Sequence, residues 1–301
     1  MIDKLDRFRE RIHAVLPALH VSSMLLAEQG QNNDVLRVNE DLIFRFPRYS
    51  EGIERLEREA NLLRIVVKHA TLPVPDPFVA SFEIKEAGSA FMGYRAINGS
   101  PLEHDALRAF RDEVSVQALA TDLAMFLRTL HNIPLDEIPS GFTQDQFHPR
   151  QEWADLYTRI QLKLFPHMSP AARAWATVHF EEFLHDPRNQ EITSVLVHGD
   201  FGPTNILTNS SRSAVTGIID FGSAHLDDPA VDLAAVSTVG QGFLNYFMWV
   251  YPGIESALHR VRFYKGTFAL QEALFGIETG DRAALQAGMA DIPPSPGMSA
   301  V

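Results

Sequence analysis

The chain contains no cysteine among its 301 residues. A framework of disulfides and metal sites built from thiolates are therefore both excluded. No apolar run approaches the ~20 residues that a helix needs to span a bilayer. Basic residues are also few, because 26 Lys and Arg stand against 38 Asp and Glu and give a formal net charge of −12. Such a chain would repel phosphates, so nucleic acid is not expected as its main partner.

What remains is the composition of a globular protein. Hydrophobic residues make up 46% of the chain, which is enough for a large core. The length allows two domains. Residues 1–7 are charged and helix-like, unlike a signal peptide. We therefore expect a cytoplasmic protein that binds no membrane and acts as a monomer.

The most specific pattern lies in residues 197–222. It reads V-H-G-D-F-G-P-T-N-I-L and, after a short polar gap, G-I-I-D-F-G, so that Asp200 is followed by Asn205 and then by Asp220. This is the order of groups in a phosphoryl-transfer site. The first aspartate would accept the hydrogen bond of the attacking hydroxyl. The asparagine and the second aspartate would hold Mg²⁺ through hard oxygen ligands.

Each of these fragments alone could be an ordinary turn, since H-G-D and D-F-G match by chance. Their context favours catalysis. Apolar runs typical of strands, residues 194–197 and 215–219, precede the two motifs, and residues 205–207 indicate a short strand before a turn. A hairpin with all three polar groups at the ends of its strands would make one convergent site.

The N-terminal part supplies candidate phosphate-binding residues. Alternation in the strand at 41–47 places Arg45 on the face opposite Phe44 and Phe46. The charged helix predicted over 52–69 carries Glu59 on its apolar face. A strand cation paired with a helix glutamate is how kinases hold the α- and β-phosphates. The alternative is an ordinary charged surface helix, whose ion pairs are common and weak.

Further candidates for nucleotide binding lie in a turn and a strand. The polar turn at 29–33 could bring backbone N–H groups close to phosphate, through Gly30, Asn32 and Asn33, or it could be a plain hairpin tip. The strand predicted at 90–96 precedes a linker and supplies three more candidate nucleotide-binding residues, Phe91, Gly93 and Tyr94. We place the lobe boundary there, with residues 1–97 forming a nucleotide-binding lobe and 98–301 a lobe that carries the catalytic, metal and acceptor sites.

From about residue 105 the pattern is mostly helical. The amphipathic helix predicted over 114–131 ends at His131, and a histidine at that position is typical of a structural role. Asp228-Pro229 signals the start of another helix. Asp232 falls inside that helix, where a short acidic side chain is unfavourable unless it has a specific partner.

These motifs together resemble the antibiotic phosphotransferases, the aminoglycoside and macrolide kinases, which share the protein-kinase fold. The N-terminal half looks most like the aminoglycoside 2″-phosphotransferases. The resemblance covers nearly the whole chain and rests on the following segments: 43–48, 72–75, 97–102, 119–131, 198–205, 218–224 and 228–233. It implies an α+β, bilobal protein-kinase-like fold, with a five-stranded antiparallel N-lobe sheet, one main helix and a mostly helical C-lobe.

The resemblance also assigns roles. Asp200 matches the catalytic aspartate, Asn205 and Asp220 the Mg²⁺ ligands, and Glu59 the helix glutamate. Asp232 matches the acid that braces the catalytic loop, and His198 supports the same loop. One departure is Arg45, where most of these enzymes have lysine. The two cations are not interchangeable, although arginine can bind phosphate through two donors.

The acceptor is the open question. Aminoglycosides are polycations, and the resemblance implies carboxylates in their site, for which Asp227, Glu272 and Glu278 are the candidates. The segment 233–252 contains no acidic residue after Asp232, and an apolar wall would suit a macrolide instead. The plain alternative is that its aromatic residues are helix core.

We therefore predict an ATP- or GTP-dependent antibiotic kinase that needs Mg²⁺, with an aminoglycoside as first acceptor. A macrolide 2′-kinase and a choline, sugar or homoserine-type metabolite kinase are the catalytic alternatives, because fold does not determine substrate. A non-catalytic pseudokinase is the last alternative, and Arg45 is its only support.

Overall fold

The computed structural model describes residues 4–29, 32–102, 113–142, 149–189, 192–209, 214–237 and 241–293. Its strands are β1 (Met24–Gln29), β2 (Asn33–Val38), β3 (Leu42–Pro47), β4 (Pro77–Ser81), β5 (Phe91–Arg95), β6 (Ser100–Pro101), β7 (Val195–Val197), β8 (Ile206–Thr208), β9 (Val215–Ile218) and β10 (His225–Asp227). Its α-helices are α1 (Lys4–Val15), α2 (Glu51–His69), α4 (Glu113–His131), α5 (Pro149–Arg159), α6 (Pro170–His185), α7 (Ala230–Val236), α8 (Gln241–Val250), α9 (Leu258–Thr279) and α10 (Arg282–Asp291).

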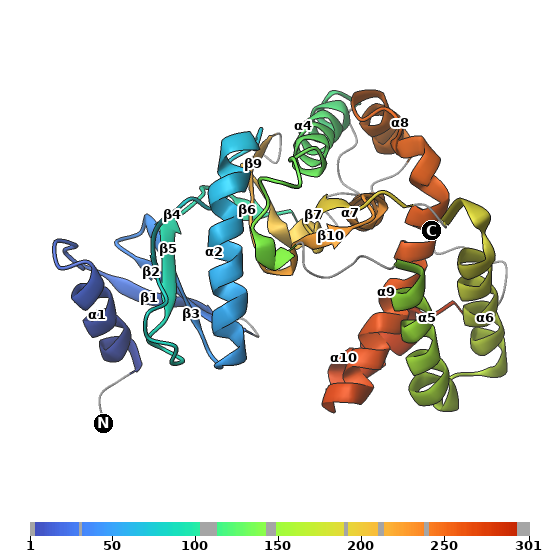
Figure 1. The fold of residues 1–301 in the computed structure, drawn as a ribbon, viewed down its shortest axis with the longest axis horizontal. Coiled ribbons are helices and arrows are strands. Elements are labelled where there is room, and N and C mark those ends of the chain that lie inside the picture. The colour runs from blue at the N-terminus through green and yellow to red at the C-terminus, as the bar shows by residue number, and fades with distance from the viewer. Residues whose placement is uncertain are drawn as a thin grey trace.

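The first five strands form one antiparallel sheet in the order β1-β2-β3-β5-β4. Helices α1 and α2 cover its two faces (Figure 1). Alternation along β3 decides which side chain meets which helix. Phe44 and Phe46 pack with Phe8 of α1, whereas Arg45 points to the opposite face, that of α2. The predicted five-stranded sheet and the orientation of Arg45 are thus confirmed.

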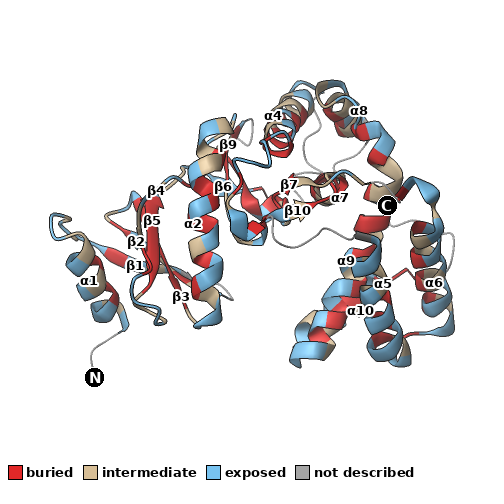
Figure 2. Ribbon diagram, viewed as in Figure 1, coloured by how far each residue is buried: buried red, intermediate tan, exposed pale blue. Residues whose placement is uncertain are grey.

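Helix α2 lies between this sheet and the rest of the molecule (Figure 1). Its apolar residues recur at helical spacing, and Ile53, Leu56, Leu63 and Val66 are all buried. Glu59 is buried among them. Such a position is unfavourable for a carboxylate unless a cation pairs with it. Figure 2 shows how buried residues gather in the sheet and on the inner faces of the packed helices.

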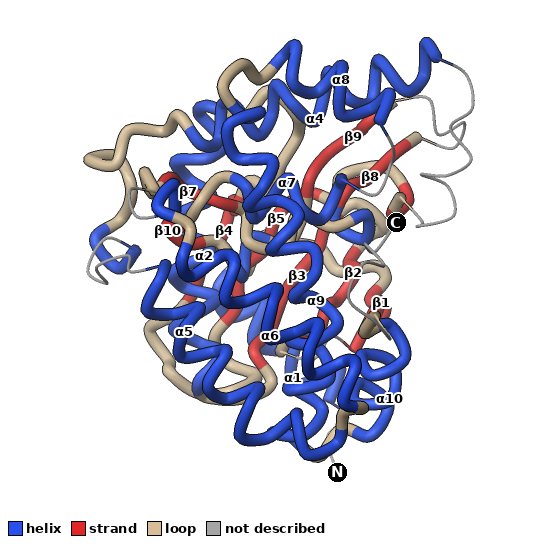
Figure 3. The backbone as a smooth tube through the Cα atoms, turned by 90° about the vertical axis from the view of Figure 1, so that its right-hand side faces the viewer, coloured by secondary structure: helices blue, strands red, loops and turns tan. Residues whose placement is uncertain are grey.

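The remaining strands form two small sheets. Strands β8 and β9 make the predicted hairpin and run side by side in Figure 3, and β6 extends that sheet. Strand β7 pairs instead with β10, a pairing that sequence patterns did not indicate. The chain therefore leaves the first sheet after β5 and joins the second at β6.

Helices surround these two small sheets. Helix α8 packs against α4 at one end, while α9 contacts α6, α7 and α10. Pro229 precedes α7, and the Asp228 carboxylate accepts the N–H of Ala230 at 3.0 Å, as its helix-start signal predicts. Within the described residues, no helix combines the length and the apolar character needed to cross a membrane.

Candidate active site

The predicted catalytic and metal-binding residues line one cleft of about 640 Å³. Asp200 follows β7, Asn205 precedes β8 and Asp220 follows β9, so the ends of three short strands bring them together. The sheet and α2 contribute Arg45, Glu59 and Tyr94 to the opposite wall. Sequence reasoning had found all six. Asn32 and Asn33 also line this cleft, whereas Gly30 lies outside the described residues.

Two other predicted nucleotide-binding residues do not line the cleft. Phe91 is buried on the α1 side of the sheet, where its ring stacks on Phe46 at 5.0 Å between centroids. Gly93 lies on the same face, and a Cβ there would stand 2.7 Å from the ring of Phe44. Both residues serve packing, because alternation along β5 turns only Met92 and Tyr94 toward α2.

Arg45 joins the two sides of the cleft. Its Nη1 donates to Glu59 Oε1 at 2.5 Å, and its Nη2 donates to Asp220 Oδ1 at 3.2 Å. The side chains of Arg45 and Glu59 are only 9% and 2% exposed. Burial alone would lower the pKa of Arg45, but Glu59, Tyr94 and Asp220 raise it, so the guanidinium stays charged. A planar fork can hold two carboxylates at once in this way.

Burial on the same wall also shifts the pKa values of Glu59 and Tyr94. Burial raises the pKa of Glu59, while Arg45 and a backbone hydrogen bond from Phe221 oppose the rise. Burial likewise raises the pKa of Tyr94 to about 12, so its hydroxyl stays protonated. Arg45 and Tyr94 thus present a cation and a neutral hydroxyl to the cleft.

Asp200 is fixed by its own loop. The Asn205 side-chain amide donates to the Asp200 carbonyl at 2.8 Å and to Asp200 Oδ2 at 2.9 Å. Burial raises the pKa of Asp200, and the hydrogen bond from Asn205 opposes that rise. Because the Asn205 nitrogen is used here, its side-chain oxygen is the atom left for a cation.

His198 connects this loop to the strand that leads to Asp220. Its Nε2 lies 3.0 Å from the carbonyl of Ile219, and its Nδ1 accepts the N–H of Asp200 at 3.3 Å. Since a carbonyl only accepts, Nε2 must carry the proton. The predicted supporting role of His198 therefore has a geometric basis.

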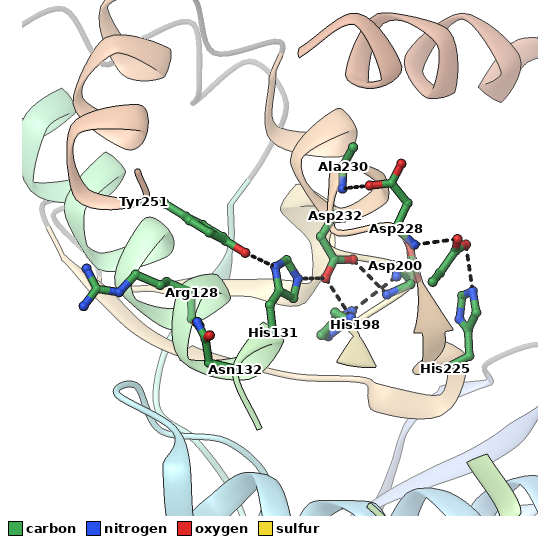
Figure 4. A network of polar contacts seen from close by, with 12 residues as sticks. Arg128, His131, Asn132, His198, Asp200, His225, Asp228, Ala230, Asp232 and Tyr251 are labelled. Carbon is green, nitrogen blue, oxygen red and sulfur yellow. Dashed lines mark hydrogen bonds and ion pairs between the residues drawn. The ribbon is translucent and has the colours of Figure 1, made fainter. Parts of the chain in front are cut away.

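Asp232 supports the same loop from α7. Its Oδ2 accepts the N–H of His198 at 2.7 Å, and its Oδ1 accepts that of Gly199 at 2.9 Å (Figure 4). Burial opposes ionisation, but the hydrogen bonds from the His131 side chain and from the backbone N–H of His198 keep the pKa of Asp232 below its usual range. These contacts account for an acidic residue inside a helix.

Two backbone positions in the site have left-handed conformations. Gly199 has φ 78°, and a Cβ there would stand 2.3 Å from the carbonyl oxygen of Ser223. Only glycine fits this position in H-G-D. Asp220 has φ 65°, an uncommon value for a residue with a side chain. The Asp220 side chain lines the cleft and is 49% exposed.

The predicted acceptor-binding carboxylates do not line the cleft. Asp227 accepts from His225 Nε2 at 3.1 Å and from the N–H of Asp228 at 2.7 Å. Glu278 pairs with Arg159 and Lys163 at the surface. Glu272 is exposed on α9. Helix α8 packs on α4, and Phe243 and Phe247 are buried as helix core, whereas Trp249 is 77% exposed, so the plainer of the two sequence interpretations holds for part of the segment.

Two participants, Arg55 and His225, were missed by sequence reasoning, and a third, His131, was given only a structural role. Arg55 of α2 lines the cleft, His225 contacts Asp227, and His131 contacts Asp232. Helical spacing places Arg55 one turn before Glu59, which is a usable signal. His225 and Asp227 lie two residues apart on β10, whereas the contact of His131 with Asp232 joins distant elements and leaves no local pattern.

Comparison with known proteins agrees with this geometry. The family model described as "Phosphotransferase enzyme family" matches residues 24–263. The chain belongs to this phosphotransferase family. It is 27% identical over 293 residues to viomycin phosphotransferase of Streptomyces vinaceus, covering 95% of this chain and 98% of that protein.

Solved structures extend the comparison. The GDP complex of aminoglycoside 2′-phosphotransferase-IIIa matches with a TM-score of 0.85 and 26% identity, covering 96% of each chain. A macrolide 2′-phosphotransferase type I matches with a TM-score of 0.71 and 22% identity, covering 97% and 98% of the two chains. The second match shows a shared fold. The kinase-like fold and the phosphotransferase activity expected from the sequence are thereby confirmed.

Proposed function

We propose that this phosphotransferase transfers the γ-phosphoryl group of ATP or GTP to a hydroxyl group of an aminoglycoside-type antibiotic. The observation that carries the chemistry is the convergence of Asp200, Asn205, Asp220 and Arg45 on one cleft. Phosphoryl transfer needs mainly positioning and charge stabilisation, and these groups provide both.

The donor set of the site fits Mg²⁺. Asp220 offers a half-exposed carboxylate and Asn205 an amide oxygen, and such hard oxygen ligands are those that Mg²⁺ takes in phosphate sites. The ion, when bound, would neutralise charge on the phosphate oxygens. Arg45 would then exchange its contact with Asp220 for a phosphate oxygen while keeping its contact with Glu59.

Asp200 is proposed to orient the acceptor hydroxyl. Asn205 occupies Oδ2, and among the contacts of the described residues Oδ1 is left for the acceptor. The raised pKa of this partly buried carboxyl, caused by burial, makes it a better proton acceptor than an exposed aspartate. Its loop is fixed by Asp232, so the carboxylate would be held in place before the acceptor binds.

The acceptor class rests on the relatives and on one structural observation. The similar proteins include enzymes named for viomycin and for aminoglycosides. None of the described residues of the apolar segment that favoured a macrolide lines the cleft, so the segment gives no support for a macrolide acceptor. A net charge of −12 also favours a cationic acceptor. A groove of about 490 Å³ shares Arg55, Glu59, Gly222 and Ser223 with the catalytic cleft, which gives room beside it.

The test is Mg²⁺-dependent turnover with ATP and GTP separately, against a panel of aminoglycosides, viomycin, macrolides and small metabolite alcohols. Asp200→Ala should abolish turnover while leaving nucleotide affinity within about twofold. Asp41→Ala, which removes a surface partner of Arg95, is the matched control and should behave as wild type. Turnover that survives Asp200→Ala would disprove the mechanism. Tight nucleotide binding with no turnover on the whole panel would contradict the assigned acceptor class.

The organisation of the chain belongs to the same proposal. We place the lobe boundary between residues 97 and 98, supported by the change of sheet between β5 and β6. We also propose that the protein works as a cytoplasmic monomer, where ATP and GTP are available. Sedimentation with and without nucleotide would test the monomer.

A further inference from the structure

His131, the last residue of α4, lies outside the cleft and yet contacts the group that supports the catalytic loop. Its Nε2 lies 3.1 Å from Asp232 Oδ2, and its Nδ1 lies 3.0 Å from the Tyr251 hydroxyl. The side chains of His131 and Asp232 are 1% and 0% exposed. Figure 4 shows the imidazole between the other two groups, each from a different part of the chain.

The hydrogen-bonding capacities determine how protons are arranged in this row. Asp232 already accepts two backbone N–H groups, so it is ionised and can only accept. His131 Nε2 must therefore carry a proton. In a neutral imidazole Nδ1 is then an acceptor, and the Tyr251 hydroxyl donates its hydrogen bond to it. Burial raises the pKa of Tyr251 to about 12, which keeps that donor in place.

The third hydrogen bond on Asp232 has a mechanical consequence. Two amides on one carboxylate still allow the carboxylate plane to tilt, and a side-chain donor from a third direction removes that freedom. The amides that it holds belong to His198 and Gly199, directly before Asp200. A misplacement of about 1 Å in a catalytic group can cost about a hundredfold in rate.

The far end of the row is itself anchored. Arg128 of α4 donates to the carbonyl of Val250 at 3.0 Å, next to Tyr251 and at the end of α8. Asn132 donates back to the Arg128 carbonyl at 2.5 Å. The contacts of Arg128 with Val250 and of His131 with Tyr251 thus tie the end of α8 to the end of α4 at two places. Neither Tyr251 nor His131 is among the residues that line the cleft.

We propose that His131, oriented by Tyr251, is a positioning residue for phosphoryl transfer. It sets the orientation of Asp232, and through Asp232 it places the backbone that carries Asp200. Its effect should fall on the chemical step, because it does not line the cleft. This inference rests on the phosphotransferase activity of the family and not on the identity of the acceptor.

The kinetic test uses His131→Leu, His131→Gln and Tyr251→Phe, with the antibiotic that the panel identifies. Leucine removes every hydrogen bond and should lower kcat about ten- to a hundredfold, with the nucleotide KM unchanged within twofold. Glutamine can still donate to Asp232 and should restore most of that loss. Tyr251→Phe should lower kcat a few-fold. His69→Leu, which removes a histidine–glutamate pair at the surface, is the matched control and should have no effect.

A second measurement needs no acceptor, so its outcome is independent of the antibiotic assignment. Hydrogen exchange of the His198 and Gly199 amides should become faster in Tyr251→Phe and faster still in His131→Leu. Nitrogen NMR of the wild-type protein should show His131 as the neutral tautomer protonated at Nε2. The proposal is overturned if that tautomer is the other one, if folded His131→Leu keeps wild-type kcat, or if glutamine restores nothing.

Discussion

The two sides of the catalytic cleft are held by different forces. On the side of the sheet and α2, Arg45 is held by ion pairs with Glu59 and Asp220. On the side of the catalytic loop, Asp200 is held through backbone N–H groups bound to Asp232. An ion pair can exchange one partner for another, such as a phosphate oxygen. Backbone hydrogen bonds to a buried carboxylate cannot exchange without moving the loop.

This difference predicts different kinetic consequences. Changes at Arg45 should act mainly on nucleotide binding, because its present partner Asp220 is exchangeable. Changes at Asp232 should act mainly on the chemical step, because they move Asp200 itself. The comparison would fail if both sets of variants altered the same kinetic constant.

The largest effect is expected for Asp232→Asn. The amide can satisfy one N–H of the loop but presents its own donors to the other N–H or to His131. We expect kcat to fall at least a hundredfold and the free energy of unfolding to fall by about 3 kcal/mol. Steady-state kinetics and urea denaturation measure the two effects. A kcat within threefold of wild type would show that the loop does not depend on this carboxylate.

The next effect is expected for Arg45→Met, with Arg45→Lys as the matched variant that keeps the charge. Methionine removes a charged donor, so the nucleotide KM should rise about tenfold or more. Lysine should give an intermediate KM, because one ammonium cannot reproduce the planar fork that holds Glu59 and Asp220 together. Steady-state kinetics at varied nucleotide concentration provides the check. Equal KM values for lysine and methionine would assign the effect to geometry alone and contradict a role for charge.

A smaller and pH-dependent effect is expected at His225, behind Gly199. Its two nitrogens face the Ser223 carbonyl and Asp227, both acceptors. Burial opposes the charge, but these contacts raise the pKa of His225. A raised folded-state pKa stabilises the protein fully below the unfolded value, about 6.5. That contribution disappears as the pH rises through the folded value.

Because the His225 side chain is 47% exposed and solvent screens its contacts, the variant His225→Gln should cost well below about 1 kcal/mol near pH 6 and progressively less above pH 7. Urea midpoints measured across that range, with wild type beside the variant, give the difference directly. A cost that grows with rising pH would reverse the sign and disprove the charged imidazole.

The smallest effect is expected at the surface, at Glu278→Gln. Hydrogen bonds from Arg159 and Lys163 lower the pKa of Glu278 to about 2. Both partners are half-exposed, so solvent screens the pairs and the loss should stay below about 0.5 kcal/mol. Kinetic constants should not change. A clear rise in the KM of the acceptor would instead support the acceptor-binding role that the sequence predicts for Glu278.

Much of the fold and site could be predicted because the signals are local. Alternation along one strand put Arg45 opposite Phe44, and helical spacing put Glu59 on the inner face of α2. The predicted site residues that do not line the cleft are those whose positions depend on how separate elements pack. Alternation alone could not say that Phe91 and Gly93 face α1, nor that α8 packs on α4. Two of the candidate acceptor carboxylates, Asp227 and Glu278, met other partners for the same reason.

The sequence by itself determined the chemistry of this protein: Asp200, Asn205 and Asp220 each follow or precede a short strand within a readable motif. Tertiary structure alone decided which distant groups meet. Arg45 reaches Asp220 across 175 residues, and His131 reaches Asp232 across 101 and Tyr251 across 120. The physical reason is the separation along the chain between the residues that meet. Motifs and periodicities record contacts along one strand or helix, whereas these contacts depend on how separate elements pack together.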